Sequence, residues 1–337
     1  MAKGLVTLFG GAGFIGRYAA RNFVEAGFRV RIAVRRPHLA ADVRLAGAPG
    51  WVDIVQANVR HKPSVVSAIE GADAVVNLAG ILYEKGQQSF QAAHREGVEN
   101  IAEACSALGV SRFVHVSAIG ANVHSKSEYA RTKGEAEAVA REILPSTVIL
   151  RPSIVFGPED KFFNRFAAMA AHPIASIFPV LPAIGGGNTR VQPVFAGNVA
   201  EAITAAVVRN DAQGNTYELG GASSYTFNEL FEFIGRTVGR KCYAMPIPFF
   251  VAKPMGLTFG ALFRYVWPLS TGILGAPPIT GDQVELLKQD NVVSPEAKTL
   301  KDLGVSTLQT VEATTPSYLY TYRPYGQYYK SSNPGHS

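Results

Sequence analysis

The hydrophobic positions of this chain change their period repeatedly over its first two thirds. Short continuous apolar runs, typical of strands buried on both faces, alternate with segments in which apolar residues recur every three to four positions, as in helices. We expect strands at residues 5–9, 29–34, 52–56, 74–78, 112–116, 147–150 and 216–219. We expect helices at residues 14–25, 63–69, 94–108, 127–142 and 226–238, and a short strand entering a helix within 192–206.

A repeating strand-helix order implies right-handed crossovers, which place the strands in one parallel sheet with helices on both faces. The pattern therefore predicts an α/β fold with a doubly wound parallel sheet of the Rossmann type. The alternation fades after Pro158. We expect a nucleotide-binding domain at 1–160 with a returning segment at about 191–221, a smaller C-terminal lobe at 161–190 and 222–315, and an extended tail at 316–337.

A glycine-rich turn joins the first expected strand to the first helix. Gly10 and Gly13 allow a sharp turn and a close approach of phosphate to the backbone, and Gly16 lets the helix pack close to the sheet. Phe14 and Ile15 begin the helix, whose N-terminus attracts a pyrophosphate. These five residues are therefore candidate positions for binding a dinucleotide cofactor.

Arginines follow the second strand, where a dinucleotide fold often places an acid that binds the ribose 2′-hydroxyl. Arg35 and Arg36 stand at this point, and Arg17 lies in the first turn of the first helix. A guanidinium group suits a 2′-phosphate, so we expect NADPH as the cofactor. The alternative is that each arginine is a solvated surface residue.

Further cofactor contacts are expected at the ends of the third and fourth strands. Asn58 and Val59 follow the third strand, where the adenine would lie. Ala79 and Gly80 are small residues at the carboxyl end of the fourth strand, where a cofactor would cross the sheet.

Charge is concentrated near the start of the chain. The net charge is +6, and residues 1–60 hold nine Lys/Arg against three Asp/Glu, so the remainder is neutral overall. This favours a local anionic ligand and argues against a nucleic-acid partner. Two cysteines in no spaced motif predict a reducing compartment and no metal site.

Targeting segments are not expected. The strand and the glycine turn begin within ten residues of Met1, which leaves no room for a secretory signal. Pro173, Pro179 and Pro182 interrupt the long uncharged stretch at 166–189, so we expect no transmembrane span.

Tyr129 and Lys133 are four residues apart on an expected helix and so point the same way. A neighbouring ammonium favours a phenolate and can lower the pKa of a tyrosine towards the working range. The same lysine can hold the nicotinamide ribose. Ser117 follows the fifth strand and is a further candidate for this site. Cys105 lies in the apolar stripe of its helix and is expected to be a core residue.

At this point the sequence resembles the short-chain dehydrogenase/reductase superfamily, in its extended or atypical branch, over about residues 4–230. The glycine turn, the run from Asn77 to Gly80 that includes Leu78, and the Arg151-Pro152 turn carry the resemblance together with Ser117, Tyr129 and Lys133. It implies that the tyrosine is the general acid/base, that the lysine binds ribose and lowers the tyrosine pKa, and that the serine polarises a substrate oxygen. Leu78 and Pro152 then join the expected cofactor contacts.

The sequence departs from that family at three places. Active extended members follow the fifth strand with a run of serines, but only Ser117 is left here, and Ala118 follows it. Asn58 replaces the usual acid after the third strand, and the helix around Asn198 lacks an aspartate. These changes leave Ser117, Tyr129 and Lys133 as candidates for a vestigial catalytic site.

A narrower resemblance reaches the C-terminal third. The run at 278–294, with the glycine turn and the turn at 117–121, is similar to the nucleotide-binding accessory subunits of respiratory complex I. The resemblance implies tightly bound NADPH without turnover, other complex I subunits as partners, and a place on the peripheral arm near the membrane domain. It implies the cytoplasmic face of a bacterial inner membrane, or the matrix side for a mature organellar chain.

Two C-terminal segments have an unusual composition. Residues 233–281 hold five Lys/Arg, several aromatic residues and no Asp or Glu. One interpretation is that this segment contacts lipid headgroups or an acidic, apolar partner. The alternative is that it forms the core of a substrate lobe and that its basic residues are incidental. The tail after Pro316 has six of the 13 tyrosines, which suits a segment that lies along another surface or folds back on its own domain.

The sequence leaves more than one function open. The first hypothesis is an accessory subunit in which NADPH acts as a fixed brace. The second is an active NADPH-dependent reductase or epimerase acting on a nucleotide sugar, an isoprenoid or a quinone-like carbonyl. A third is a regulator that senses the NADPH/NADP ratio.

Overall fold

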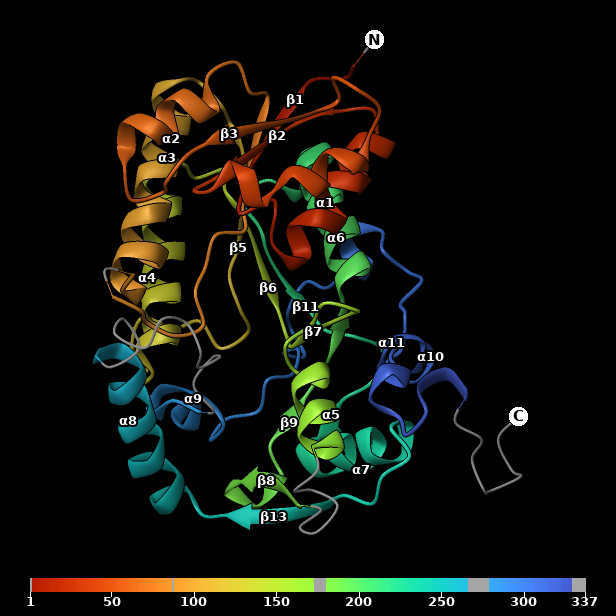
Figure 1. Ribbon diagram of the computed structural model, residues 1–337. Helices are drawn as coiled ribbons and strands as arrows, with labels where there is room; N and C mark the ends of the chain where they lie inside the picture. Colours follow the sequence, from red (N-terminus) through yellow and green to blue (C-terminus); the bar gives the residue numbers. More distant parts are fainter. Residues whose placement is uncertain (1, 87, 173–179, 266–278, 329–337) are drawn as a thin grey trace.

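The computed structural model describes residues 2–86, 88–172, 180–265 and 279–328, and its centre is a seven-stranded parallel sheet (Figure 1). Across the sheet the strands are β11 (Thr216–Leu219), β6 (Val148–Pro152), β5 (Arg112–Val116), β4 (Ala74–Asn77), β1 (Leu5–Phe9), β2 (Arg29–Val34) and β3 (Val52–Gln56). The predicted fold class is confirmed, and each expected strand lies within two residues of its observed bounds.

Helices cover both faces of the sheet (Figure 1). One face is covered by α1 (Phe14–Glu25) and α6 (Ala196–Val208), which pack against each other. The other face is covered by α2 (Lys62–Ile69), α3 (Gly97–Ala107) and α4 (Glu128–Ile143). This three-layer arrangement is the doubly wound architecture that the alternating pattern predicts.

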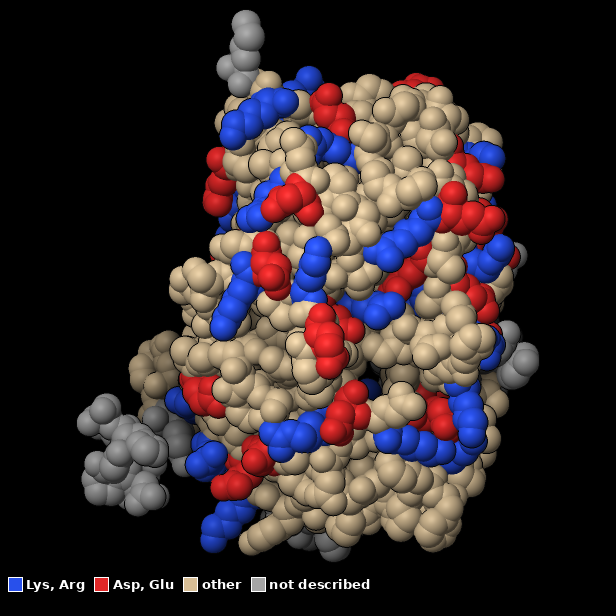
Figure 2. Space-filling model, turned by 180° about the vertical axis from the view of Figure 1, so that it is seen from behind, with Lys and Arg blue, Asp and Glu red and all other residues tan. Residues whose placement is uncertain are grey.

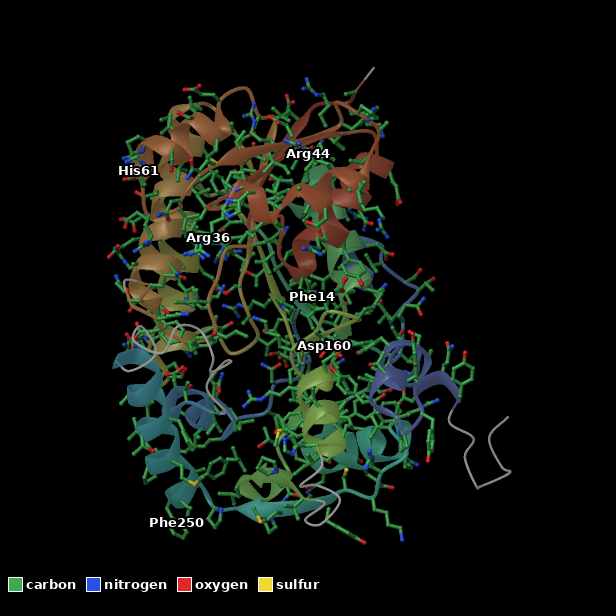
Figure 3. The ribbon with its side chains drawn as sticks, viewed as in Figure 1. Phe14, Arg36, Arg44, His61, Asp160 and Phe250 are labelled. Atoms are coloured by element: carbon green, nitrogen blue, oxygen red, sulfur yellow. The ribbon has the colours of Figure 1, made fainter. Side chains whose placement is uncertain are left out.

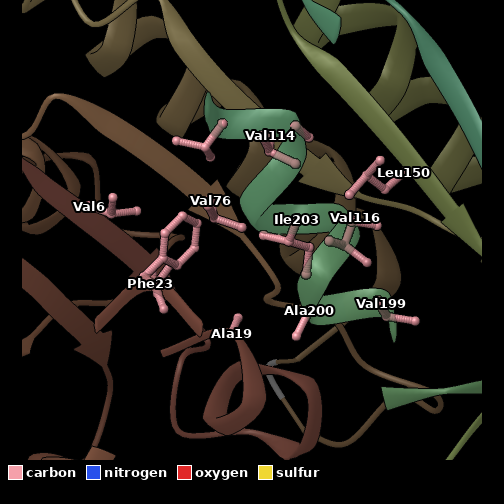
Figure 4. Close-up of a cluster of buried hydrophobic side chains, with 14 of the residues drawn as sticks. Val6, Ala19, Phe23, Val76, Val114, Val116, Leu150, Val199, Ala200 and Ile203 are labelled. Atoms are coloured by element: carbon pink, nitrogen blue, oxygen red, sulfur yellow. The ribbon is translucent and has the colours of Figure 1, made fainter. Parts of the chain in front are cut away.

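An apolar core fills the space between the sheet and the helices on each of its faces. The first core contains Phe23 of α1, Ile203 of α6 and Val114 of β5 (Figure 4). Phe113, the neighbouring strand residue, points into the second core because successive strand residues face opposite ways. Cys105 lies fully buried in the second core, and burial raises the pKa of its thiol to about 12, so its predicted role in packing is confirmed.

The strand order reverses between β1 and β4. Phe9, the last residue of β1, pairs with Ala33 of β2 on one side and with Asn77 of β4 on the other. In open α/β sheets, ligands bind in the crevice outside the carboxyl ends of the strands at this switch point. The glycine turn begins one residue later, so it lies at that crevice.

One helix differs from its predicted form. The helix expected at 94–108 begins as a π-helical turn, η3 (Gln91–Glu96), and continues as α3. Such turns are rare and often occur at functional sites. Here the turn carries His94, which is only 1% exposed.

The remaining helices and strands lie beyond the carboxyl edge of the sheet (Figure 1). They are β7 (Val155–Phe156), α5 (Phe163–Ala171), β8 (Val180–Ile184), β9 (Arg190–Val191), β10 (Val194–Phe195), β12 (Tyr225–Thr226), α7 (Phe227–Thr237), β13 (Tyr243–Ile247), α8 (Phe249–Tyr265), α9 (Gly281–Leu286), α10 (Val311–Thr314) and α11 (Pro316–Leu319). Thr226 caps α7 as expected, with Glu229 completing a capping box. The division into a nucleotide-binding domain and a lobe stays a prediction.

Most of the described part of the acid-free segment lies in β13 and α8. Several of its apolar side chains are exposed, including Tyr243 (61%), Phe250 (78%) and Leu257 (59%). Its residues 266–278 lie outside the described part of the chain. In the described ranges, no helix has both the length and the apolar character that a membrane crossing requires.

The tyrosine-rich tail folds back on the protein as far as Arg323. The Tyr318 hydroxyl donates a 2.7 Å hydrogen bond to the buried Asp160 carboxylate, and Tyr322 donates to Asn164 at 3.1 Å. Beyond this point Tyr325 is 85% exposed. Of the two expected arrangements, the first part of the tail therefore has the one in which it folds back on its own protein. Tyr329 lies outside the described residues.

We predict that Tyr318→Phe destabilises the protein by about 1–3 kcal/mol, because it leaves a buried carboxylate without one hydrogen-bond donor. Urea unfolding at pH 7 measures the change. The matched variant Tyr325→Phe removes an exposed hydroxyl and should leave the unfolding free energy unchanged. Equal effects of the two substitutions would contradict the packing of the tail.

Candidate functional site

The glycine turn is held by backbone contacts that leave no room for side chains. Gly10 has a φ of +79°, and a Cβ there would lie 3.0 Å from the amide nitrogen of Ala79, at the end of β4. A Cβ on Gly16 would lie 2.5 Å from the carbonyl oxygen of Gly11. The turn therefore needs glycine for its conformation at the first position and for helix packing at the second.

The N-terminus of α1 faces out of this turn. Gly13 is the exposed N-cap and has no side chain that could cap the helix. The first amide bonded within the helix is that of Arg17, which donates to the Gly13 carbonyl. The amides of Phe14 and Ile15 therefore have no carbonyl acceptor within the helix, which makes this end suitable for an anion (Figure 3).

Three arginines were expected to bind a 2′-phosphate, and they differ in their surroundings. Arg17 forms a 2.9 Å ion pair with Asp42 and donates to the Ala12 carbonyl, so its guanidinium is already engaged. Arg35 and Arg36 are exposed beyond the end of β2 (Figure 3). These two are better placed to meet a new anionic group.

Asn58 and Val59 follow β3 and form a turn. The Asn58 side-chain oxygen accepts a hydrogen bond from the Arg60 amide, and the Val59 carbonyl accepts one from Asn100 of α3. Both residues are partly exposed. The turn is therefore fixed in place by its own chain and by α3.

The end of β4 meets the glycine turn and α4 at one point. The Leu78 amide donates to the Phe9 carbonyl, and the Ala79 amide donates to the Asn77 side chain. A Cβ on Gly80 would lie 3.5 Å from the Lys133 ammonium nitrogen. The predicted residues from β1, β4 and α4 are thus brought together at the same edge.

Ser117 follows β5, and the ammonium group of Lys133 on α4 reaches the end of the same strand. The buried Lys133 ammonium donates to the Val116 carbonyl at 3.1 Å. The Ser117 hydroxyl is buried and has no hydrogen-bond partner among the described residues. Pro152 is also buried at the end of β6, and its carbonyl accepts from the Ile119 amide.

The pKa values of Tyr129 and Lys133 are both shifted from their ordinary values. Burial, and then the carboxylate of Asp282, raise the pKa of Tyr129 to about 12. Burial lowers the pKa of Lys133 to about 8, partly opposed by Glu137. Burial and the Asp282 carboxylate thus shift the Tyr129 pKa away from neutrality, and the expected effect of the lysine on the tyrosine stays a prediction.

His94 is a site residue that the sequence analysis missed. Its Nε2 accepts a hydrogen bond from the Ile81 amide, and its Nδ1 lies 3.1 Å from the Thr132 hydroxyl. The ring is therefore neutral with its proton on Nδ1, and it packs edge-to-face on Tyr129 with the ring centroids 5.3 Å apart. Burial, and then the charge of Lys133, lower the pKa of His94 to about 2.

Asp282 and Asn291 were also missed as individual residues, although both lie in the run at 278–294. Asp282 accepts hydrogen bonds at the N-terminus of α4 from the Ser127 hydroxyl and the Glu128 amide, at 2.8 and 2.6 Å. Asn291 donates to the Ile119 carbonyl at 3.2 Å. The run at 278–294 can be found in the sequence, but the spacing of its residues does not show which distant helices and strands they contact.

Within the described ranges, no group of three or more His, Cys, Asp or Glu side chains is arranged to hold a metal ion. The residues that gather at the site are hydrogen-bond donors, a lysine, a tyrosine and backbone amides. This set can bind phosphates and a ribose at the edge of the sheet.

We predict that stability falls as the pH drops below about 6.5 because of His94. Its imidazole takes a proton in the unfolded chain but stays neutral when folded, so each pH unit costs up to about 1.4 kcal/mol. Urea unfolding of His94→Asn at pH 7, 6 and 5 should show a shallower loss than the wild type. The control His124→Asn, at an exposed position, should keep the wild-type slope, and an unchanged slope in His94→Asn would contradict the prediction.

Comparison with known proteins shows the family and the fold of the chain. Residues 6–220 match the NAD dependent epimerase/dehydratase family. The fold is similar to that of an NADPH-dependent quinone oxidoreductase from Escherichia coli solved with NADPH, with a TM-score of 0.70, 18% identity and coverage of 94% of this chain and 99% of that one.

Two curated relatives are similar over most of their length. The mitochondrial NADH-ubiquinone oxidoreductase 40 kDa subunit of Neurospora crassa is 31% identical over 322 residues, covering 96% of this chain and 80% of the relative. The mitochondrial NADH dehydrogenase [ubiquinone] 1 alpha subcomplex subunit 9 of Mus musculus is 31% identical over 305 residues, covering 89% and 76%. The chain therefore belongs to the NAD dependent epimerase/dehydratase family and is a homologue of these two subunits of NADH-ubiquinone oxidoreductase.

Proposed function

We propose that this protein is an NADPH-binding accessory subunit of respiratory NADH:ubiquinone oxidoreductase that holds its nucleotide without turning it over. The observation that carries the proposal is an intact phosphate-binding turn beside a tyrosine whose pKa is raised to about 12. The first feature favours binding, and the second disfavours acid/base chemistry at neutral pH.

The residues fit a dinucleotide. The glycine turn is a cradle that a Cβ at Gly10 or Gly16 would fill, and its free amides suit a pyrophosphate. The buried Ser117 hydroxyl lacks a partner, as expected of a group that bonds to a ligand. Lys133 is close enough to Gly80 to meet a ribose that crosses the end of β4. A bound nicotinamide would supply a hydride.

The arginines favour NADPH over NADH. No acidic residue follows β2, and Arg35 and Arg36 are exposed at the place where a ribose 2′ substituent would lie. In the described part of the chain no ion pair occupies either guanidinium, in contrast to Arg17 and Asp42. A 2′-phosphate would gain charge-assisted hydrogen bonds from them.

Catalysis is disfavoured by the environment of Tyr129. An efficient acid or base has a pKa near the working pH, but burial and the Asp282 carboxylate move this phenol further from neutrality. Ala118 also stands where a further serine would polarise a substrate oxygen. The site therefore keeps its binding groups while its reacting group is a weak acid.

A nucleotide that does not react can still be retained for stability. A ligand that binds only the folded state stabilises that state by about 2.7 kcal/mol at a hundredfold excess over its dissociation constant. NADPH bound between β1, β4 and α4 would act as such a brace.

The C-terminal lobe is the expected docking surface. Phe250 projects from the lower end of α8 (Figure 3), and nearby apolar side chains on β13 are exposed. By contrast, acidic and basic residues are interleaved over most of the face in Figure 2, which gives no extended basic surface for a nucleic acid. We expect the lobe to contact other subunits on the matrix or cytoplasmic side, and lipid contact stays a prediction.

Purification from native membranes tests the proposal. We predict that the chain emerges with subunits of NADH:ubiquinone oxidoreductase and with bound NADPH, measured by mass spectrometry of the proteins and by nucleotide analysis after acid release. Recovery of the chain alone, or of the complex without a nucleotide, would contradict it.

The second candidate is an active NADPH-dependent reductase of a quinone-like carbonyl or another carbonyl substrate. The observation that favours it is the survival of Tyr129, Lys133 and Ser117 at one edge of the sheet. Substrate-dependent oxidation of bound NADPH that Tyr129→Phe abolishes would establish this function in place of the first.

We predict that replacing Arg35 and Arg36 together by alanine weakens NADPH binding about tenfold or more and leaves NADH binding nearly unchanged. The reason is the loss of charge-assisted bonds to the 2′-phosphate. Titration calorimetry with both nucleotides measures the ratio. Arg29→Ala, at the exposed opposite end of the same strand, is the control and should not alter the ratio. Equal weakening for NADPH and NADH would contradict the assignment.

A further inference from the structure

The N-terminus of α4 is capped from far along the chain. Ser127 is the local N-cap, and its hydroxyl accepts from the Ala130 amide. The carboxylate of Asp282 accepts from the Ser127 hydroxyl and from the amides of Glu128 and Tyr129, at 2.8, 2.6 and 3.2 Å. A carboxylate at this end satisfies free amides and interacts favourably with the helix dipole.

The residues beyond this cap belong to the nucleotide site. Tyr129 is in the first turn of α4, and Lys133, one turn later, reaches the Val116 carbonyl at the end of β5. A shift of the first turn would therefore move both side chains relative to Gly80. In the described part of the chain, the Tyr129 amide is the one expected nucleotide position to which Asp282 is hydrogen-bonded, so we expect its effect to be exerted through the helix.

Asp282 is held in place by the C-terminal lobe. It lies in the first turn of α9, which Thr280 and Gln283 cap reciprocally. Helix α9 packs against α8 at a close crossing, where a Cβ on Gly256 would lie 2.7 Å from the Gly281 amide nitrogen. Figure 1 shows α8 and α9 beyond the end of α4. The position of Asp282 thus depends on how α8 and α9 pack against each other and against the rest of the protein.

The same segment is bonded to the site at a second place. Asn291 donates to the Ile119 carbonyl, two residues after Ser117, and accepts from the Ser153 hydroxyl at 2.6 Å. The segment from Asp282 to Asn291 therefore bridges the start of α4 and the turns that follow β5 and β6. Both ends of this bridge lie next to residues expected to contact the nucleotide.

We infer that Asp282 is a positioning residue that couples nucleotide binding to the packing of α8 and α9 against the rest of the protein. The inference rests on the proposed nucleotide site. With Asp282 bonded, the first turn of α4 is ordered where the nucleotide requires it. Because coupling is reciprocal, bound nucleotide in turn stabilises α9 against the body of the protein. A partner docked on α8 would then favour retention of the nucleotide.

The test compares Asp282→Asn with Asp290→Asn in the full chain. Asp290 lies in the same segment and accepts a 2.8 Å hydrogen bond from the Arg190 amide, but it does not contact α4. Titration calorimetry with NADPH should show a dissociation constant raised about tenfold in Asp282→Asn, from the loss of charge-assisted bonds. It should stay within about twofold of the wild type in Asp290→Asn. Circular dichroism confirms that both variants are folded.

Hydrogen exchange on the wild type supplies an independent measurement. We expect NADPH to slow exchange at residues 280–287 as well as in the glycine turn, and Asp282→Asn to remove only the first effect. If Asp282→Asn does not fold, the wild-type exchange decides alone. Unchanged affinity in a folded Asp282→Asn protein, or no slowing at 280–287 in the wild type, overturns the coupling. A wild type that binds neither NADPH nor NADH overturns the nucleotide site itself, and the coupling with it.

Discussion

The close approach of backbone to backbone around the glycine turn is the constraint on which the site depends. Gly10 lies against the end of β4, and Gly16 lets α1 press against the carbonyls of the same turn. No residue with a Cβ could replace Gly16 without a shift of α1 or of the Gly10 and Gly11 carbonyls that it packs against. Because α1 packs on α6 and β1 pairs with β4, this contact fixes the helix amides relative to the ends of the strands. The proposed cofactor site and the packing of α1 on the turn therefore depend on the same backbone atoms.

Burial is the physical effect by which the proposed site would bind a nucleotide without reacting with it. The interior that positions Lys133, Tyr129 and His94 also disfavours their charged forms, so the pKa of Lys133 and of His94 is lowered and that of Tyr129 is raised. A hydrogen-bonding group can hold a ligand in either state, whereas an acid or base needs a pKa near the working pH. Under the proposed function, the same physical effect would preserve recognition of the nucleotide and weaken proton transfer.

The sequence predicted those features that depend on local pattern. Buried strands read as apolar runs, the glycine turn follows a strand directly, and Thr226 precedes its helix, so each could be found from neighbouring residues. His94 could not, because its role arises from a π-helical turn and from contacts with Ile81 and Thr132. Asp282 contacts Tyr129 across 153 positions of sequence, and no spacing rule links the two. Burial and the charge of Asp282 raise the pKa of Tyr129, and neither influence can be read from the residues around Tyr129 in the sequence.

The central claim is that the nucleotide is held and not turned over. The most direct measurement is the redox state of the tightly bound nucleotide in the intact complex during steady NADH oxidation, sampled by rapid quenching and nucleotide analysis. We expect bound NADPH to stay reduced through many turnovers and not to exchange with free nucleotide. Oxidation and renewal of the bound NADPH at the rate of turnover would contradict it.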